Sequence, residues 1–264
     1  MTATLRSEWT KLRTQRGTLV ALATTAVLMA GMTAWFASES ETNARFGGDD
    51  DVVQMGLAGI VFAQLAVVVV GASLITGEYA TKMLRTTLTA TQGRLRVLAA
   101  KALILIAVVL PLGVASSAVS FAIAQPLLHD GGYVAPAYPP VSLTDPAAIR
   151  AVVGTGLLLT AYALLALGVG TILRHSGATI ATGAGLLFLP FLFLGAFPER
   201  IAIRIAQLTP LAGMAIQSST DRMLAPFDGR LGMPIGPWQG LAVAFAWALG
   251  ALAIGYALLR ARDV

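Results

Sequence analysis

Six runs of apolar residues, each about 20 residues or longer, dominate this sequence. They cover residues 17–37, 52–76, 102–128, 147–173, 178–197 and 236–259. An α-helix rises about 1.5 Å per residue, so about 20 apolar residues cross the roughly 30 Å hydrocarbon core of a bilayer. Each run is therefore predicted to be a membrane-spanning helix. The expected fold class is all-α, a polytopic membrane protein with six transmembrane helices in a single domain over residues 1–264.

The composition also indicates that a bilayer is the solvent. Hydrophobic residues make up 56% of the 264 and charged residues 12%, whereas soluble domains carry about 25% charged residues. The net charge of +5 would suit nucleic-acid binding, but the basic residues flank the apolar runs instead of forming one face, so no nucleic-acid partner is expected. The absence of cysteine excludes disulfides and thiolate metal sites. The first run is too long for a signal-peptide core and is interpreted as a retained span.

The distribution of lysine and arginine predicts which side of the membrane each connection faces. With the N-terminus inside, the inner segments hold twelve of the 18 lysines and arginines, and only three of the 13 acids. The excess of basic residues in cytoplasmic loops is a general rule of membrane topology. We therefore expect a multi-pass protein of the plasma membrane with both termini in the cytoplasm.

A basic amphipathic helix is predicted over residues 1–16, before the first run. Three apolar residues at positions i, i+4 and i+7 share one face: Leu5, Trp9 and Leu12. The remaining faces carry four basic residues: Arg6, Lys11, Arg13 and Arg16. This pattern is typical of a helix that lies among lipid headgroups. The alternative is a disordered basic tail, and the regular apolar spacing favours the helix.

Two connections on the predicted outer side are distinctive. Residues 38–51 end in Asp49, Asp50 and Asp51, which lack the spacing of a calcium loop and are interpreted as a solvated cap. The segment 198–235 is too long for a plain loop. It is predicted to form two short helices that dip into the outer leaflet, the first of which ends before Pro210.

The predicted spans lack the groups that intramembrane catalysis and proton coupling require. Between their flanks they contain no Asp, Glu, Lys, Arg or His, with Arg150 near the outer end of the fourth run. Because buried charges mark proton relays and ion pathways, proton-coupled transport and intramembrane proteolysis are not expected. The sequence also lacks the G-x-x-x-x-G-K-[ST] phosphate loop. Any energy from ATP must therefore come from another polypeptide.

A few residues within the runs suggest packing or a substrate path. Gln64 could line a substrate path or form a hydrogen bond between helices, and both interpretations stay open. Phe188 and Phe191, beside Pro190, could form an aromatic cavity wall or face lipid. A stripe of small residues in the last run predicts close helix packing, within the subunit or in a dimer: Gly236, Gly240, Ala244 and Ala248.

The stretch 77–101, GEYATKMLRTTLTATQGRLRVLAAK, is the longest charged insertion on the predicted cytoplasmic side. It contains Glu-Tyr, then a basic residue, Leu, Arg and a closing Lys, and it follows an opening SEWTKLRT at residues 7–14. These features and the layout of the whole chain resemble the membrane (permease) subunits of type-2 ABC exporters. The chain departs from that family in lacking a Gly near Thr81 and a Pro near Gln92.

The resemblance implies a permease that works as a dimer, with a second copy or a related chain, and with separate ABC-type ATPase subunits. ATP and Mg would bind the ATPase, and this chain would hold no cofactor, metal or catalytic residue. Stretch 77–101 would be a coupling hairpin that docks on the ATPase. The implied contact residues are Glu78, Tyr79, Lys82, Met83, Arg85, Thr86 and Leu88. Glu78 would lie at the membrane edge, paired with Arg6, Lys11 or Arg13, and the substrate would be an exported lipid-like or antibiotic-like amphiphile.

Other interpretations stay open at this point. The basic residues of 77–101 could serve only to set topology and to bind anionic membrane lipids. The chain could also be a non-catalytic scaffold or sensor that binds a partner through the same stretch. An ion-independent secondary carrier or channel is the third alternative.

Overall fold

A computed structural model of the chain describes residues 2–40, 50–80, 93–193, 196–219 and 235–261, and within them every regular element is a helix. The first half contains α1 (Thr2–Thr14), α2 (Arg16–Glu39), α3 (Val52–Met55), α4 (Ile60–Ala80) and α6 (Arg94–Asp130). The second half contains α7 (Pro146–Leu173), α8 (Ser176–Phe193), α9 (Glu199–Leu208), the 3₁₀-helix η2 (Pro210–Gln217) and α10 (Pro237–Ala261). The predicted all-α fold class is confirmed for these residues.

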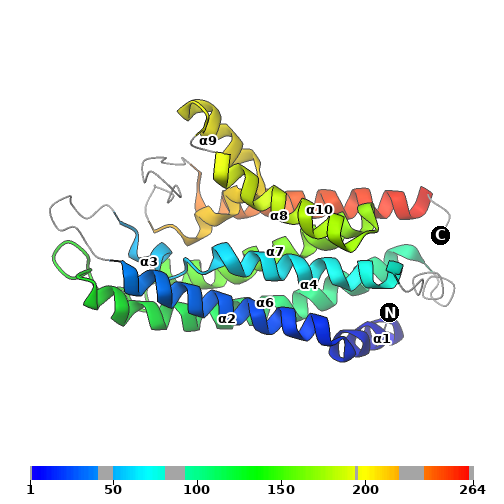
Figure 1. The fold of residues 1–264 in the computed structure, drawn as a ribbon, viewed down its shortest axis with the longest axis horizontal. Coiled ribbons are helices and arrows are strands. Elements are labelled where there is room, and N and C mark those ends of the chain that lie inside the picture. Colours follow the sequence, from blue (N-terminus) through cyan, green and yellow to red (C-terminus); the bar gives the residue numbers. More distant parts are fainter. Residues whose placement is uncertain (1, 41–49, 81–92, 194–195, 220–234, 262–264) are drawn as a thin grey trace.

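Five long helices run side by side, and α7 lies at the centre of the bundle (Figure 1). The most apolar part of α7 is 89% buried within the protein, compared with 28% for α2 and α10. Neighbouring helices approach α7 closely because small residues line the contacts. A Cβ atom on Gly71 of α4 would lie 2.1 Å from the carbonyl oxygen of Ala163, and one on Gly168 would lie 2.6 Å from the backbone of Ala251 in α10.

Five helices of the described chain are long and apolar enough to cross a membrane: α2, α4, α6, α7 and α10. They correspond to five of the six predicted runs. The remaining run, 178–197, forms the shorter helix α8, which ends at Phe193. Helix α6 has 37 residues and starts well before the predicted residue 102, so it continues beyond the apolar run into stretch 77–101.

The predicted span 52–76 is wrong at its start, because the chain there forms α3, a turn over residues 56–59, and only then α4. The turn packs directly against α2. The backbone N–H of Gly59 donates to Thr33 Oγ1 at 2.9 Å, and a Cβ at Gly59 would lie 2.1 Å from the carbonyl oxygen of Met29. Contact with α2 therefore fixes the break, which hydropathy alone does not reveal.

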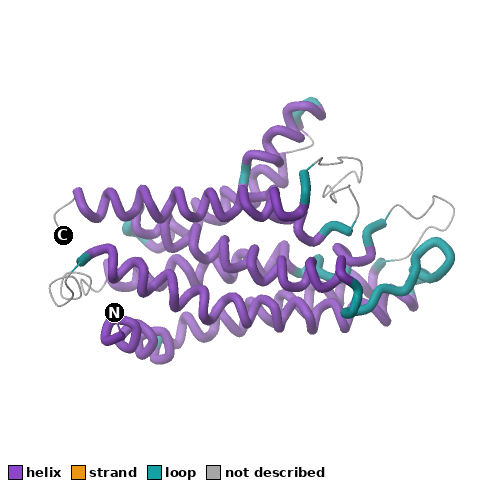
Figure 2. The backbone as a smooth tube through the Cα atoms, turned by 180° about the vertical axis from the view of Figure 1, so that it is seen from behind, coloured by secondary structure: helices purple, strands orange, loops and turns teal. Residues whose placement is uncertain are grey.

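The two ends of the bundle differ in what they hold. Helix α1, the end of α4, the start of α6 and the end of α10 share one end, which we call the proximal end (Figure 1). The distal end holds α3 and the loop 131–145, seen as teal tube in Figure 2. Helix α8 runs from the proximal end and diverges from the bundle, so that α9 projects from it (Figures 1 and 2). The two predicted short helices are present as α9 and η2, although η2 is buried against protein.

Candidate functional site

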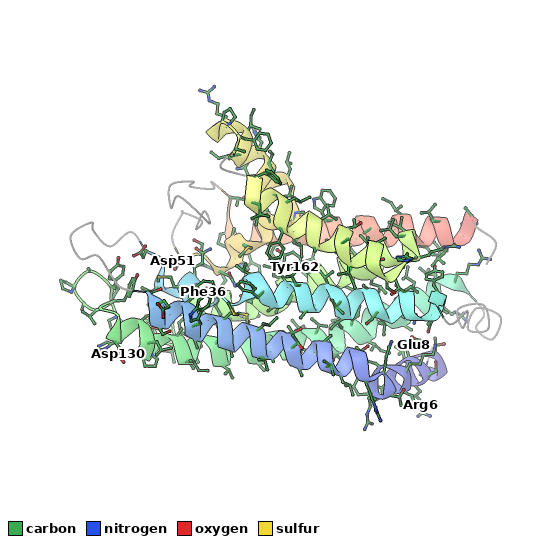
Figure 3. The ribbon with its side chains drawn as sticks, viewed as in Figure 1. Arg6, Glu8, Phe36, Asp51, Asp130 and Tyr162 are labelled. Atoms are coloured by element: carbon green, nitrogen blue, oxygen red, sulfur yellow. The ribbon has the colours of Figure 1, made fainter. Side chains whose placement is uncertain are left out.

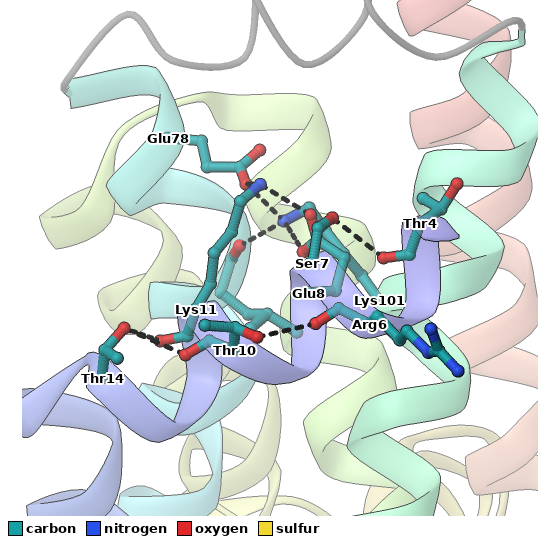
Figure 4. Close-up of polar contacts among 10 residues, drawn as sticks. Thr4, Arg6, Ser7, Glu8, Thr10, Lys11, Thr14, Glu78 and Lys101 are labelled. Atoms are coloured by element: carbon teal, nitrogen blue, oxygen red, sulfur yellow. Dashed lines mark hydrogen bonds and ion pairs between the residues drawn. The ribbon is translucent and has the colours of Figure 1, made fainter. Parts of the chain in front are cut away.

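Two acids and two lysines from three helices meet at the proximal end (Figure 4). We call Glu8, Lys11, Glu78 and Lys101 the stem cluster, because Glu78 and Lys101 stand near the two ends of stretch 77–101. Lys101 Nζ lies 2.6 Å from Glu8 Oε2 and 2.9 Å from Glu78 Oε1. Lys11 Nζ lies 2.7 Å from Glu8 Oε1 and 2.6 Å from Glu78 Oε1. Three of these four ion pairs join α1, α4 and α6 to one another, and the fourth, between Lys11 and Glu8, lies within α1.

The stem cluster is buried and electrically balanced. Glu8 and Lys101 are 0% exposed and Glu78 is 7% exposed. An ammonium group has three donors, and Lys101 uses its third on the carbonyl oxygen of Leu74, at 3.0 Å. Because an unpaired buried charge is strongly destabilising, these four side chains depend on one another. The cluster therefore fixes the relative positions of its three helices.

Lys11 stands at the more accessible side of the stem cluster. Partial burial by itself would lower the pKa of this amine, but its hydrogen bonds to Glu78 and Glu8 and the charges of these two acids outweigh burial and raise the pKa above its usual value. Lys11 therefore stays protonated at neutral pH.

Helix α1 turns the side chain of Glu8 toward the bundle. Leu12 is buried and Leu5 is half-buried, but the side chain between them on the inner face is Glu8, while Trp9 is 44% exposed. The use of Leu5, Trp9 and Leu12 as a membrane-facing apolar side stays a prediction. The ion pair of Glu8 with Lys101 sets this rotation, because both groups must be paired once they are buried. The sequence did contain a signal for the burial of Glu8, because this acid stands three positions after Leu5, within the apolar stripe.

Two more contacts bring the second half of the chain to the ends of stretch 77–101. The guanidinium of Arg174, in the turn between α7 and α8, lies 5.3 Å from the ring centroid of Tyr79, a distance suited to a cation–π contact. At the start of α6, Arg94 Nη1 donates to the carbonyl oxygen of Leu259 in α10. Four helices (α1, α4, α6 and α10) and the turn between α7 and α8 therefore meet near the ends of the stretch, either in the stem cluster or through these two arginines.

The structure describes only part of the set of predicted contact residues. Three partners were predicted for Glu78. The structure pairs Glu78 with Lys11, while Arg6 and Arg13 are exposed. The pairing of Glu78 with Lys101 was not predicted. The other proposed contact residues lie outside the described residues, and their role stays a prediction: Lys82, Met83, Arg85, Thr86 and Leu88.

Two of the three residues proposed for a substrate path, Gln64 and Phe188, have described side chains. Gln64 is buried, and its amide donates to the carbonyl oxygen of Val61 within α4, at 3.1 Å. Phe188 is half-buried and packs against the core of the bundle. The side chain of Phe191 lies outside the described part of the structure. The use of these residues as a path stays a prediction.

At the distal end, the interpretation of the aspartates as a solvated cap is wrong for Asp51, which is 4% exposed (Figure 3). Its Oδ1 accepts from the backbone N–H groups of Val53 and Gln54, both at 3.1 Å, and so caps α3. The Asp51 carboxylate also accepts from two hydroxyls, with Ser218 donating to Oδ2 at 3.2 Å and Ser219 donating to Oδ1 at 2.7 Å. Asp51 thus fastens the end of η2 to α3. Within the described residues, no group of three or more acids and histidines could hold a metal ion.

The first half of the sequence matches a known protein family. Residues 4–136 match the family described as ABC-2 family transporter protein. This is 133 of 264 residues, just over half of the chain, and it contains α1 to α6 with every member of the stem cluster. No curated protein matches the chain.

Proposed function

The chain belongs to the ABC-2 family of transporter proteins, and from this membership we propose that it is the membrane subunit of an ABC exporter driven by a separate ATPase subunit. In this proposal, stretch 77–101 is the coupling hairpin and docks on the ATPase. The stem cluster is the observation that carries the proposal. Because Glu78 and Lys101 stand at the ends of the stretch and both pair with α1, a push on the stretch moves α1, α4 and α6 together.

We infer six membrane crossings, with α8 as the fifth. The N-terminal helix α1 and the end of α10 share the proximal end (Figure 1), which requires an even number of crossings. The five long helices and α8 supply six. The 18 residues of α8 correspond to about 27 Å, close to the thickness of a bilayer core. By the lysine and arginine counts, the proximal end faces the cytoplasm of the plasma membrane.

The working unit in this proposal is a dimer of the chain, or of the chain and a related one, with two ATPase subunits that bind ATP and Mg. Closure of the ATPase pair pushes the hairpins, and the spans rock around a cavity at the dimer interface. The cargo is an exported amphiphile, which agrees with apolar spans that carry no charged ligands. The chain itself performs no covalent step.

ATP hydrolysis by the chain co-purified with its ATPase tests this proposal. We expect Arg85→Glu and Leu88→Asp to lower hydrolysis or assembly severalfold, because each places an acid on the docking surface. Leu143→Asp is the matched control, since Leu143 is exposed in the loop at the distal end. Unchanged hydrolysis and assembly in both hairpin variants would contradict coupling and support the scaffold alternative.

A further inference from the structure

An open apolar hollow lies where α8 and α9 diverge, far from the stem cluster. Its volume is about 640 Å³. Its walls include Gly185, Leu189, Pro190 and Phe193 of α8, Phe197 in the following turn and Ile205 of α9. Small-molecule sites commonly have volumes of about 300–1,000 Å³ and mostly apolar walls. The hollow therefore has the size and lining of a site for a flexible apolar chain.

The walls of this hollow are largely uncovered by the rest of the protein. Leu189 and Phe193 are both 53% exposed, and Phe197 is 44% exposed. Beyond Ser176, Thr179 and Thr182 in its first half, helix α8 is apolar as far as Phe193, so this surface lies in the hydrocarbon part of a membrane. An acyl chain matches this surface in chemistry, because the chain buries the exposed rings without presenting any polar group.

Helix α9 places positive charge beside the hollow. Arg200 and Arg204 are one helical turn apart and exposed, and Arg204 directly precedes the lining residue Ile205. Among the described residues neither arginine forms an ion pair. Including Glu199, the helix carries a net charge of +1.

The exposed Ile201 and Leu208 give α9 an apolar surface next to its arginines. This combination is typical of a helix at the boundary between headgroups and acyl chains. Arginine is also well suited to bind phosphate, because its planar guanidinium can donate two parallel hydrogen bonds. The arginines thus stand at headgroup level at one end of the apolar hollow.

We propose that the hollow between α8 and α9 binds an anionic phospholipid of the leaflet at the distal end. One acyl chain occupies the hollow, and Arg200 and Arg204 hold the phosphate and the remaining headgroup charge. This site is separate from the coupling hairpin. The proposal requires only that the chain is embedded in a bilayer, so it stands or falls independently of ATP-driven transport.

Photolabelling of the purified chain in neutral detergent tests the site. The probes are phosphatidylglycerol and phosphatidylcholine that carry a diazirine in one acyl chain, and labelled peptides are mapped by mass spectrometry. We expect phosphatidylglycerol to label residues 185–205 about 25-fold more strongly than phosphatidylcholine, because each of the two arginines contributes roughly a factor of five toward anionic lipid. Equal labelling by the two probes would overturn the assignment of an anionic lipid.

A variant that fills the hollow tests its location. A Cβ atom on Gly185 meets only Leu189 Cδ1, at 3.5 Å, so the ring of Gly185→Phe can enter the hollow without moving the backbone. We expect this variant to lose labelling of residues 185–205 by both probes. Gly31→Phe on α2 is the matched control, because nothing lies within 4 Å of its added Cβ, and it keeps wild-type labelling. Persistent labelling in Gly185→Phe would place the lipid elsewhere.

A charge variant tests the headgroup separately and does not depend on filling the hollow. We expect Arg200→Gln with Arg204→Gln to reduce phosphatidylglycerol labelling about 25-fold, to the phosphatidylcholine level. Arg96→Gln with Arg260→Gln removes the same charge at the proximal end and preserves the preference. Cross-links that join α8 of two copies, with no lipid label there, would show that a second copy fills the hollow and would overturn the proposal.

Discussion

Lys101 is the side chain on which the proximal end depends most, because it contacts both acids of the stem cluster and is fully buried. We expect Lys101→Met to lower the free energy of unfolding by about 3–5 kcal/mol, since it leaves an excess of buried negative charge. The change is measured as the shift of Tm in detergent. Arg13→Gln, which removes an exposed charge from α1, is expected to change stability by less than about 0.5 kcal/mol. Equal shifts in the two variants would show that the cluster is not buried as described.

The pairing itself is tested by combining Lys101→Met with Glu8→Gln. The double variant removes one acid and one base, and Lys11 with Glu78 remains as a neutral pair. We therefore expect it to be less destabilised than the sum of the single variants, by about 1–3 kcal/mol. Additive effects would mean that Glu8 and Lys101 do not act on each other.

The sequence allowed only part of this cluster to be predicted. Lys11 was among the partners expected for Glu78, because the family layout brings α1 to the membrane edge near the stretch. Glu8 and Lys101 are 93 positions apart, and helical periodicity carries no information about contacts over such a distance. Periodicity also cannot register that Glu8 is buried through its pairing with Lys101.

The contact between α10 and η2 depends on a glycine. A Cβ on Gly240 would lie 2.1 Å from the carbonyl oxygen of Ala212, so Gly240→Ala must push the two helices apart. We expect a loss of about 1–3 kcal/mol, seen as a lower Tm. Gly250→Ala in the same helix has free space around its Cβ and is expected to gain a few tenths to 1 kcal/mol. A lower Tm for Gly250→Ala than for Gly240→Ala would contradict this packing.

The Asp51 contacts predict that η2 is released when this carboxylate is removed. The chain has no cysteine, so a single Met214→Cys reports on η2 without background. Met214 is buried, and we expect slow maleimide labelling that becomes at least about tenfold faster when Asp51→Ala is added, since about 1.4 kcal/mol changes an opening equilibrium tenfold. Ser142→Cys in the exposed loop should label at the same rate in both backgrounds. An unchanged rate at position 214 would mean that Asp51 does not hold η2.

The helices themselves were predictable where composition decides them. Five apolar runs became long helices, and the stripe of Gly240, Ala244 and Ala248 packs inside the subunit. The break before α4 was not predictable. It depends on the cap from Asp51 and on the close approach of Gly59 to α2, and both arise from tertiary contacts that leave the hydropathy unchanged.

The arrangement of the whole chain predicts the sidedness of its loops. Ser142 and Thr10 are exposed and lie at opposite ends of the bundle. In intact cells, we expect a membrane-impermeant maleimide to label Ser142→Cys, and to label Thr10→Cys only after permeabilisation, because the topology proposed from the lysine and arginine counts places the proximal end in the cytoplasm. Labelling of Thr10→Cys in intact cells would reverse the orientation.

The overall layout followed from hydropathy, charge counts and resemblance, whereas the divergence of α8 from the bundle did not. Residues 178–197 are apolar on every side, so their composition gives no indication of which face meets protein. Only the structure shows that α8 leaves much of its surface uncovered and that α9 projects from it.

A photoreactive amino acid at Leu88, in the stretch between Glu78 and Lys101, tests whether the stem cluster supports a docking site for an ATPase. The chain is irradiated in its native membrane, and the cross-linked partners are identified by mass spectrometry. We predict a cross-link to an ABC-type ATPase subunit, and none to that subunit from the same amino acid placed at Ser142. Cross-links from position 88 to lipid alone, or to the ATPase from position 142 alone, would contradict the coupling role of the hairpin.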